Sequence, residues 1–330
     1  MNPLLSVKHL KVSFRHAFKT VDAVRDVSFD VYPGDTIGIV GESGCGKSVM
    51  VKALLNLFSS PSAKIEGGEV FYEHQDLLSL SERELRKIRG KEIGMIFQDP
   101  MTSLNPTMRV GKQIIESLLK HEPHISHQEA HARALSLLSL VGIPEPALRV
   151  MQYPHELSGG MRQRVMIALA LAPSPRLLIA DEPTTALDVT IQAQILQLLK
   201  EIQQKTHTSI LFITHDLSVV AGFCNKVMVM YAGKIVETAT VDMLFKNPKH
   251  PYTQRLLESI PRLDLPNEAA LHPILGAPPD LSFTLEGCSF APRCHKLLNI
   301  CIQQSPPLFD VEGRTCACWH YDPRCVEVHT

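Results

Sequence analysis

Gly41-Glu42-Ser43-Gly44-Cys45-Gly46-Lys47-Ser48 is the stretch of sequence that decides the fold. It fits the pattern G-x-x-x-x-G-K-[ST] and stands between a short apolar segment, 36–40, and a helical segment, 47–57. A glycine-rich loop in this context brings backbone N–H groups close to a phosphate, and the helix N-terminus adds partial positive charge. The stretch therefore predicts a loop that binds the phosphates of a nucleotide.

Two side chains of this loop are expected to contact the nucleotide and its metal. Lys47 should reach the β and γ phosphates, and Ser48 should ligate Mg²⁺, an ion that takes few protein ligands. A thiol near a helix N-terminus often has a lowered pKa, so Cys45 is predicted to be more acidic than an ordinary cysteine and open to oxidation. The other expected nucleotide-binding positions line the loop with their backbone: Gly41, Ser43, Gly44, Cys45 and Gly46.

A second element needed for hydrolysis is an apolar segment that ends in two carboxylates, Leu177 to Glu182. Neighbouring residues of a strand point in opposite directions, so the two acids are expected to serve different purposes. Asp181 should hold the Mg²⁺ ion, whereas Glu182 should orient and deprotonate the attacking water. The sequence thus predicts hydrolysis of the bound nucleotide.

Around these elements the sequence predicts a largely parallel α/β sheet. Segments 177–180 and 209–214 have the length of buried strands and follow helical stretches, which favours crossover helices. Segments 4–14 and 23–31 alternate like half-buried strands. Segment 110–141 is predicted to be helical throughout, as an inserted helical subdomain.

Between the loop and the carboxylates lies Leu157-Ser158-Gly159-Gly160-Met161-Arg162-Gln163-Arg164, and here the chain resembles the ATP-binding cassette (ABC) ATPases. The resemblance implies the α/β fold of a P-loop NTPase cassette over residues 1–245, with a RecA-like core, an antiparallel β subdomain and a helical subdomain at about 100–165. It also implies a head-to-tail dimer. In that dimer Ser158, Gly159 and Gly160 of one subunit grip the ATP bound by the phosphate loop of the other.

The remaining motifs of the family occur in the expected order. Phe97-Gln98-Asp99 resembles the Q-loop, which implies that Gln98 senses Mg²⁺ and the γ-phosphate. Ala186-Leu187-Asp188 resembles the D-loop, and Ile213-Thr214-His215-Asp216 resembles the strand end with the switch histidine. Phe14 falls where the family places an aromatic ring on adenine. The implied catalytic set is Glu182, His215 and Gln98, and the implied Mg²⁺ ligands are Ser48, Gln98 and Asp181.

Some ABC ATPases are soluble proteins of DNA repair, chromosome maintenance or translation, and this class is the alternative. Chromosome-type members insert long coiled coils before the signature, but no sustained heptads occur here. Translation-type members carry two cassettes in one chain, whereas this sequence has one. A net charge of -1 also gives no basic field for nucleic acid. We therefore expect a transporter subunit without a nucleic-acid partner.

A narrower resemblance is to the peptide and nickel importers, on segment 98–106 (Gln-Asp-Pro-Met-Thr-Ser-Leu-Asn-Pro) and segment 250–257 (His-Pro-Tyr-Thr-Gln-Arg-Leu-Leu). It implies an ATPase subunit of an importer for di- or oligopeptides, with nickel and cationic peptides as alternatives. The implied partners are a second ATPase subunit, identical or different, integral-membrane permeases and, indirectly, a solute-binding protein. ATP would close the dimer, hydrolysis would reopen it, and the helices of 100–141 would pass the motion to a permease.

Segment 246–330 is expected to form a C-terminal extension, because it holds 11 of the 23 prolines and six of the eight cysteines. Few long apolar runs occur in residues 265–330, so we expect this part to need a metal as a staple. Without a secretion signal its thiols should stay reduced. The spacing C-x5-C-x6-C, with Cys318 after 16 further residues, resembles the subfamily pattern associated with a [4Fe–4S] cluster. The implied ligands are Cys288, Cys294, Cys301 and Cys318.

Zinc and free thiols are the alternatives at these cysteines, and Cys316 could substitute for Cys318. Structural zinc usually takes its ligands from pairs spaced by two to four residues, a pattern that Cys316 and Cys318 only approach.

No segment is apolar enough to cross a membrane, since the longest candidate, 165–180, contains Pro173, Pro175 and Arg176. The N-terminal segment lacks the apolar region of a signal peptide. The expected location is therefore the cytoplasmic face of the inner (plasma) membrane, as a peripheral subunit.

Overall fold

The computed structural model describes residues 2–15, 19–58, 60–185, 187–260, 274–283 and 285–326. The chain divides into two compact units, each described by itself below. The first unit comprises residues 32–36 and 79–213. The second comprises residues 2–31, 37–78 and 214–330.

Three parallel strands form the sheet of the first unit: β6 (Ile93–Ile96), β7 (Leu177–Asp181) and β8 (Ser209–Thr214). β7 pairs with both neighbours, and its last residue, Asp181, lies opposite Ile213. Every residue of β7 and β8 is buried, which explains why both strands are apolar except at their ends, because a parallel sheet is covered on both faces. The carboxyl ends of these strands share one edge, so the residues that follow β6 and β7 lie near one another.

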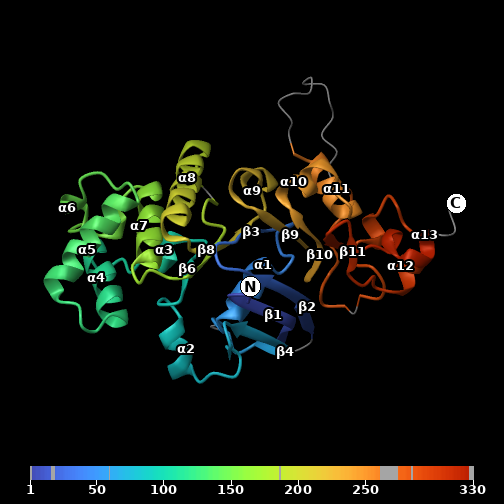
Figure 1. Ribbon diagram of the computed structural model, residues 1–330, viewed down its shortest axis with the longest axis horizontal. Helices are drawn as coiled ribbons and strands as arrows, with labels where there is room; N and C mark the ends of the chain where they lie inside the picture. Colours follow the sequence, from blue (N-terminus) through green and yellow to red (C-terminus); the bar gives the residue numbers. More distant parts are fainter. Residues whose placement is uncertain are drawn as a thin grey trace. The chain divides into compact units, whose positions relative to one another are not determined.

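The helices of the first unit include three that pack together, α4 (Val110–His121), α5 (His127–Leu140) and α7 (Gly159–Leu171) (Figure 1). The others are α2 (Glu82–Ile88), α3 (Pro100–Ser103), α6 (Pro146–Arg149), the 3-10 turn η1 (Pro154–Glu156) and α8 (Val189–Thr206).

The prediction of one continuous helical segment over 110–141 is wrong at its middle. α4 ends at His121, and Glu122 has φ -127° and ψ 77°. The reason is Pro123, which lacks an N–H donor and pushes the preceding residue out of the helical region. α5 then begins with a new cap, because Ser126 and Glu129 form a reciprocal capping box.

The second unit contains an antiparallel sheet in the order β2-β1-β4-β5. Its strands are β1 (Leu5–Arg15), β2 (Thr20–Val31), β4 (Ala63–Tyr72) and β5 (Gln75–Asp76). Helix α1 (Lys47–Leu54) contacts β1 and β2 (Figure 1).

A further set of strands in the second unit includes the one that leads into the phosphate loop. β3 (Thr36–Val40) runs parallel to β9 (Lys226–Tyr231), which pairs antiparallel with β10 (Lys234–Thr240). The C-terminal extension adds β12 (Arg314–Cys316) to β10 and β11 (Phe309–Val311) to β12. The helices of this part are α9 (Leu217–Phe223), α10 (Val241–Lys246), α11 (Pro251–Glu258), α12 (Asn299–Gln303) and α13 (Pro323–Val326), with the turns η2 (Ala291–Arg293) and η3 (Trp319–Tyr321).

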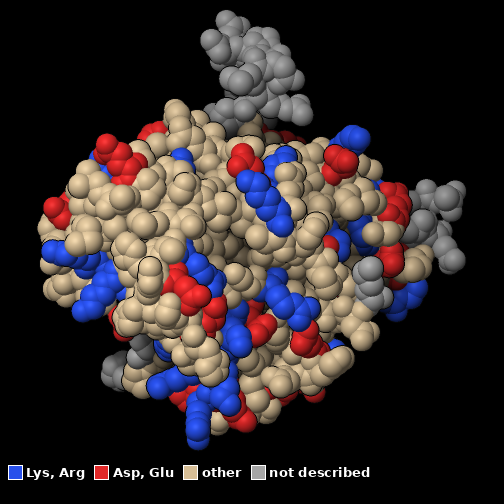
Figure 2. Space-filling model, turned by 60° about the vertical axis from the view of Figure 1, so that its left-hand side comes forward, with Lys and Arg blue, Asp and Glu red and all other residues tan. Residues whose placement is uncertain are grey.

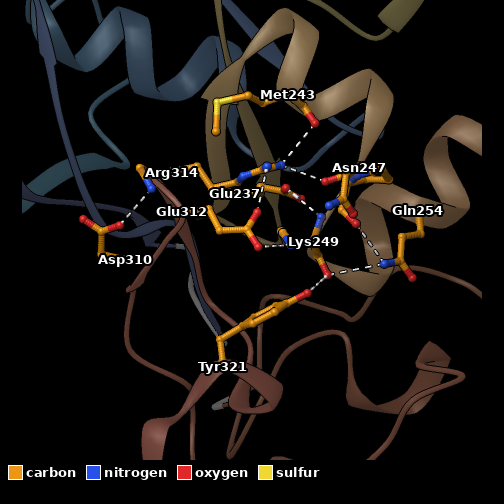
Figure 3. A network of polar contacts seen from close by, with 11 residues as sticks. Glu237, Met243, Asn247, Lys249, Gln254, Asp310, Glu312, Arg314 and Tyr321 are labelled. Carbon is orange, nitrogen blue, oxygen red and sulfur yellow. Dashed lines mark hydrogen bonds and ion pairs between the residues drawn. The ribbon is translucent and has the colours of Figure 1, made fainter. Parts of the chain in front are cut away.

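Polar contacts hold the extension on β10 and α10 (Figure 3). Arg314 Nη1 donates to the carbonyls of Met243 at 3.1 Å and Asn247 at 2.7 Å. The fully buried carboxylate of Glu237, on β10, accepts hydrogen bonds from the backbone N–H groups of Lys249 at 2.8 Å and His250 at 2.9 Å. Tyr321 donates its hydroxyl to the Lys249 carbonyl at 3.1 Å.

The surface carries charges of both signs, in keeping with the net charge of -1. Basic and acidic side chains are interspersed over the face shown in Figure 2. None of the helices in the described ranges is both long and apolar enough to span a bilayer.

Candidate functional site

The phosphate loop joins β3 to α1 in the second unit and packs closely against neighbouring backbone. Gly46 begins α1 with φ 102°, and a Cβ atom there would lie 2.2 Å from the carbonyl oxygen of Ala23. A Cβ on Gly41 would lie 2.1 Å from the carbonyl oxygen of Met230. Only glycine fits either position, so the loop keeps its backbone, rather than side chains, at its surface.

Lys47 lies folded over the loop that precedes it. Its side chain is almost fully buried, and Nζ donates to the carbonyls of Gly41 at 2.8 Å and Glu42 at 3.1 Å. Both acceptors are neutral, whereas a phosphate is charged and forms stronger hydrogen bonds with an ammonium group. Phosphate can therefore replace these partners. Ser48 follows as the second residue of α1 and is half-buried.

The prediction of an acidic thiol at Cys45 is wrong. The side chain is buried, and this burial raises the pKa of the Cys45 thiol above its ordinary value. Lys47 Nζ lies 3.9 Å from Sγ and acts in the opposite direction, but desolvation has the larger effect. The predicted acidity rested on the helix N-terminus, which the sequence indicates, whereas the burial of the thiol follows only from the folded structure.

In the first unit the two carboxylates follow one another at the end of β7. Asp181 is 1% exposed, and Glu182 adopts a left-handed backbone with φ 48°. The Glu182 Oε2 atom accepts hydrogen bonds from Thr185 Oγ1 at 2.8 Å and from Gln98 Nε2 at 3.4 Å. Gln98 reaches this place because β6 and β7 are parallel neighbours. The structure thus brings the predicted pair Gln98 and Glu182 together.

Thr185 is a functional candidate that the sequence analysis missed. It lies in a turn after β7, where its backbone N–H donates to the Glu182 carbonyl at 3.2 Å. Its hydroxyl then fixes the orientation of the carboxylate. The available signal was the spacing of three residues, which is the spacing at which a hydroxyl and a preceding residue meet in a turn.

The expected signature lies at the start of α7. Ser158 is the N-cap and accepts from Met161 N at 3.3 Å, and a Cβ on Gly159 would meet nothing within 4 Å. Ser158 and Gly159 are exposed. Gly160 is half-buried, and a Cβ there would lie 3.1 Å from Ile191.

The other predicted site residues are Asp188, Phe14 and His215. Asp188 is exposed and caps α8 by accepting from Ile191 N at 2.9 Å, while Ala186 lies outside the described residues. In the second unit, Phe14 is half-buried on β1 and meets Phe58 edge to face, with centroids 6.1 Å apart. His215 directly follows β8 and is exposed.

Comparison with known proteins assigns the family. Residues 24–185 match the family described as ABC transporter, and residues 236–301 match the C-terminal region of oligopeptide and dipeptide transporters. This chain belongs to the ATP-binding subunits of oligopeptide and dipeptide ABC transporters. The match of the C-terminal region favours this class over the soluble ABC ATPases of DNA repair, chromosome maintenance or translation.

Individual relatives cover nearly the whole ABC subunit. It is 58% identical to an oligopeptide transport ATP-binding protein of Bacillus subtilis, over 93% of this chain and 86% of the relative. It is 54% identical to a dipeptide transport ATP-binding protein of the same organism, over 98% and 96%. Among solved structures, the dimeric cassette MJ0796 with ADP and Pi is 29% identical with a TM-score of 0.65, and the match covers 72% of this chain and 98% of that one. The predicted ABC cassette fold, the ATPase class and the resemblance to the peptide importers are confirmed.

The cysteines predicted as ligands in the C-terminal extension of this ABC subunit line one small cavity of about 10 Å³. Burial raises the pKa values of the Cys288 and Cys294 thiols, and that of the Cys318 thiol to about 12. Cys316 is fully buried in β12, opposite Glu237. Within the described ranges, no three histidine, cysteine or acidic side chains stand as a ready set of ligands for one ion. The four that line the cavity are Cys288, Cys294, Cys301 and Cys318.

Proposed function

We propose that the chain is the ATP-hydrolysing subunit of an importer for di- or oligopeptides, in which ATP closes a dimer of ATPase subunits and hydrolysis reopens it. The observation that carries the proposal is the arrangement around Glu182. Its carboxylate is held by Thr185 and Gln98 beside the buried Asp181. The names of the relatives as oligopeptide and dipeptide transport proteins support the solute class.

In this proposal each predicted residue has one role in binding or hydrolysing Mg-ATP. Lys47 leaves its loop carbonyls and binds the β and γ phosphates, and a bound Mg²⁺ would neutralise charge on the phosphates. Glu182 orients the attacking water and accepts its proton at a carboxylate oxygen, while His215 binds the γ-phosphate. Phe14 stacks on adenine. The Mg²⁺ ligands in this proposal are Ser48, Gln98 and Asp181.

A second subunit completes each site. The exposed N-terminus of α7 presents Ser158, Gly159 and backbone N–H groups that suit a γ-phosphate bound by another subunit. Asp188, also exposed, belongs to the segment that resembles the D-loop and is a further proposed nucleotide-binding residue. The dimeric state of the related cassette MJ0796 supports this assembly. Permeases, and through them a solute-binding protein, are the further proposed partners, which places the subunit at the cytoplasmic face of the membrane.

Replacing Glu182 by Gln tests the proposed chemistry. The amide keeps the shape of the side chain but cannot take the proton, so turnover should fall by about 10²- to 10⁴-fold while ATP binding persists. The ATP-bound dimer should accumulate in size-exclusion chromatography. Glu201→Gln, an exposed change on α8, is the matched control and should hydrolyse ATP normally. Turnover of Glu182→Gln close to that of the wild type would exclude Glu182 as the base.

We also propose that the four cysteines of the extension hold a [4Fe–4S] cluster, with structural zinc as the alternative. Four thiolates are the usual ligands of such a cluster, and four thiols around one cavity support this assignment. Because burial raises the pKa values of Cys288, Cys294 and Cys318, these thiols are neutral when no metal is bound. Loading must then release protons, so cluster binding should weaken as the pH falls.

A further inference from the structure

An arginine of the C-terminal extension forms an ion pair with a carboxylate of the phosphate loop. Arg293 Nη1 lies 2.8 Å from Glu42 Oε2, and Nη2 lies 3.0 Å from Glu42 Oε1. Glu42 is the second residue of the phosphate loop, 251 positions earlier in the chain. The Arg293 side chain is only 5% exposed, and such a bidentate pair fixes direction as well as distance.

The remaining donors of Arg293 are also occupied. Nη1 donates to the Tyr231 hydroxyl at 3.2 Å, Nη2 to the Ile274 carbonyl at 3.2 Å, and Nε to the Leu275 carbonyl at 3.0 Å. These contacts orient the guanidinium before it meets Glu42. The hydrogen bonds to Glu42 and Tyr231 raise the pKa of Arg293, so the group is charged at any physiological pH.

A second residue of the extension holds the backbone of Glu42. The N–H of Glu42 donates to the Tyr252 hydroxyl at 3.0 Å. Tyr252, on α11, is fully buried and packs against Tyr231 and Phe290, with ring centroids 4.6 and 5.4 Å away. Its hydroxyl is therefore at a fixed position.

We propose that Arg293 and Tyr252 are positioning residues for nucleotide binding, which hold the phosphate loop in its binding shape through Glu42. The Glu42 carbonyl also accepts from Lys47 Nζ, so the same residue links the extension to the lysine that must move to the phosphates. Neither positioning residue needs to touch the nucleotide. The proposal rests on the proposed function, because it assumes that this loop binds ATP.

The physical reason is preorganisation. A loop whose N–H groups must converge on phosphates loses affinity in proportion to the fraction of molecules in which it has another shape. Fixing Glu42 at its side chain, its N–H and its carbonyl leaves the first turn of the loop few alternatives. By linkage, ATP must then stabilise the docking of the extension by the same factor as the extension stabilises ATP binding.

Two single variants and their combination test the proposal on the full-length chain. Arg293→Gln and Glu42→Gln should each raise the Kd for MgATP by about 5- to 10-fold, while kcat at saturating ATP stays within about twofold of the wild type. The Kd of the double variant should not exceed the larger of the two single-variant Kd values, because both changes remove the same interaction. Tyr252→Phe should raise the Kd by about two- to threefold.

Arg255→Gln is the matched control, since it removes an arginine from an ion pair with Glu258 on the same extension. It should bind ATP like the wild type. Should Arg293→Gln fail to fold, Glu42→Gln removes the pair without touching the extension, and circular dichroism verifies its fold. An unchanged Kd in either folded variant, or effects that add in the double variant, overturns the proposal. Failure of the wild type to bind MgATP overturns the proposed function instead.

Discussion

Replacement of Arg314 by Met should make the β11–β12 hairpin open from the sheet more often, without unfolding the rest of the chain. Methionine keeps the unbranched stem of arginine but loses the guanidinium. The lost contacts are those of Nη1 with the carbonyls of Met243 and Asn247, at the C-terminal end of α10 (Figure 3). Removing them leaves the Asn247 carbonyl, beyond the last turn of α10, without this donor, whereas the Met243 carbonyl keeps the backbone N–H of Asn247 at 3.1 Å.

The expected cost follows from the number of bonds and the burial of the donor. Hydrogen bonds from a charged group contribute about 1.5 to 3 kcal/mol each, so two give about 3 to 6 kcal/mol. Burying the guanidinium of Arg314, which is 4% exposed, offsets part of this, and its Nε is buried without a hydrogen-bond partner. The Glu312 partner is 61% exposed and adds little. We expect a net loss of about 2 to 3 kcal/mol, or an opening constant about 30- to 150-fold larger.

Native-state hydrogen exchange of peptides from 309–321 measures this opening, because it reports local unfolding that a global transition of a chain with more than one unit would hide. Arg255→Met is the control, since its partly exposed pair with Glu258 should contribute less than about 0.5 kcal/mol. If exchange in the hairpin of Arg314→Met stays within threefold of the wild type, the two carbonyl bonds do not hold the extension.

Two further predictions concern the metal and the permease. After anaerobic purification, iron and sulfide should be present in similar amounts with broad visible absorbance that is lost in air; Cys318→Ser should lower the iron content and Cys316→Ser should not. Zinc without colour would select the alternative, and absence of all three elements would remove the hypothesis. Exposed apolar residues of the helical part, Leu148 and Met151, should contribute to permease docking. Changing both to Glu should abolish peptide uptake by the reconstituted transporter and leave basal ATP hydrolysis almost intact, whereas equal loss of both activities would indicate a role in folding.

The sequence predicted the central strands and the phosphate loop because their signals are local. β7 and β8 are short runs that are apolar except at their ends, and parallel strands buried on both faces require that composition. At Gly41 and Gly46 a Cβ atom would collide with the carbonyl oxygen of another strand. The two glycines in the sequence therefore indicate the shape of the loop. The break after α4 was also local, at Pro123, but the apolar pattern on both sides concealed it.

Other features depend on contacts that no local pattern encodes. The proton affinity of Cys45 is set by burial against neighbouring elements, which outweighs the nearby Lys47. The Thr185 hydroxyl acquires its role only once β6 and β7 bring Gln98 to Glu182. The partners of side chains on loops and turns become known only from the folded structure, even where the adjoining strands are predicted correctly.

The extension docks on the sheet through contacts that lie outside the cysteine cavity. Its scarcity of apolar residues led us to expect that it needs a metal as a staple. In the structure β12 also extends the sheet at β10, and Trp319 packs with Ala291 and Cys301 in a small core. What a metal would add is rigidity at the cysteine cavity, and Arg293 directly precedes Cys294, one of the residues that line it.

A short series of contacts connects the cysteine cavity to the phosphate loop. Arg293 is covalently joined to Cys294, its guanidinium is paired with Glu42, and the Glu42 carbonyl accepts from Lys47. Arg314 in the hairpin instead bonds the carbonyls of Met243 and Asn247, on α10 and just after it, and Tyr252 also binds the Glu42 backbone. The cavity is therefore connected to the phosphate loop more directly than is the hairpin that docks the extension.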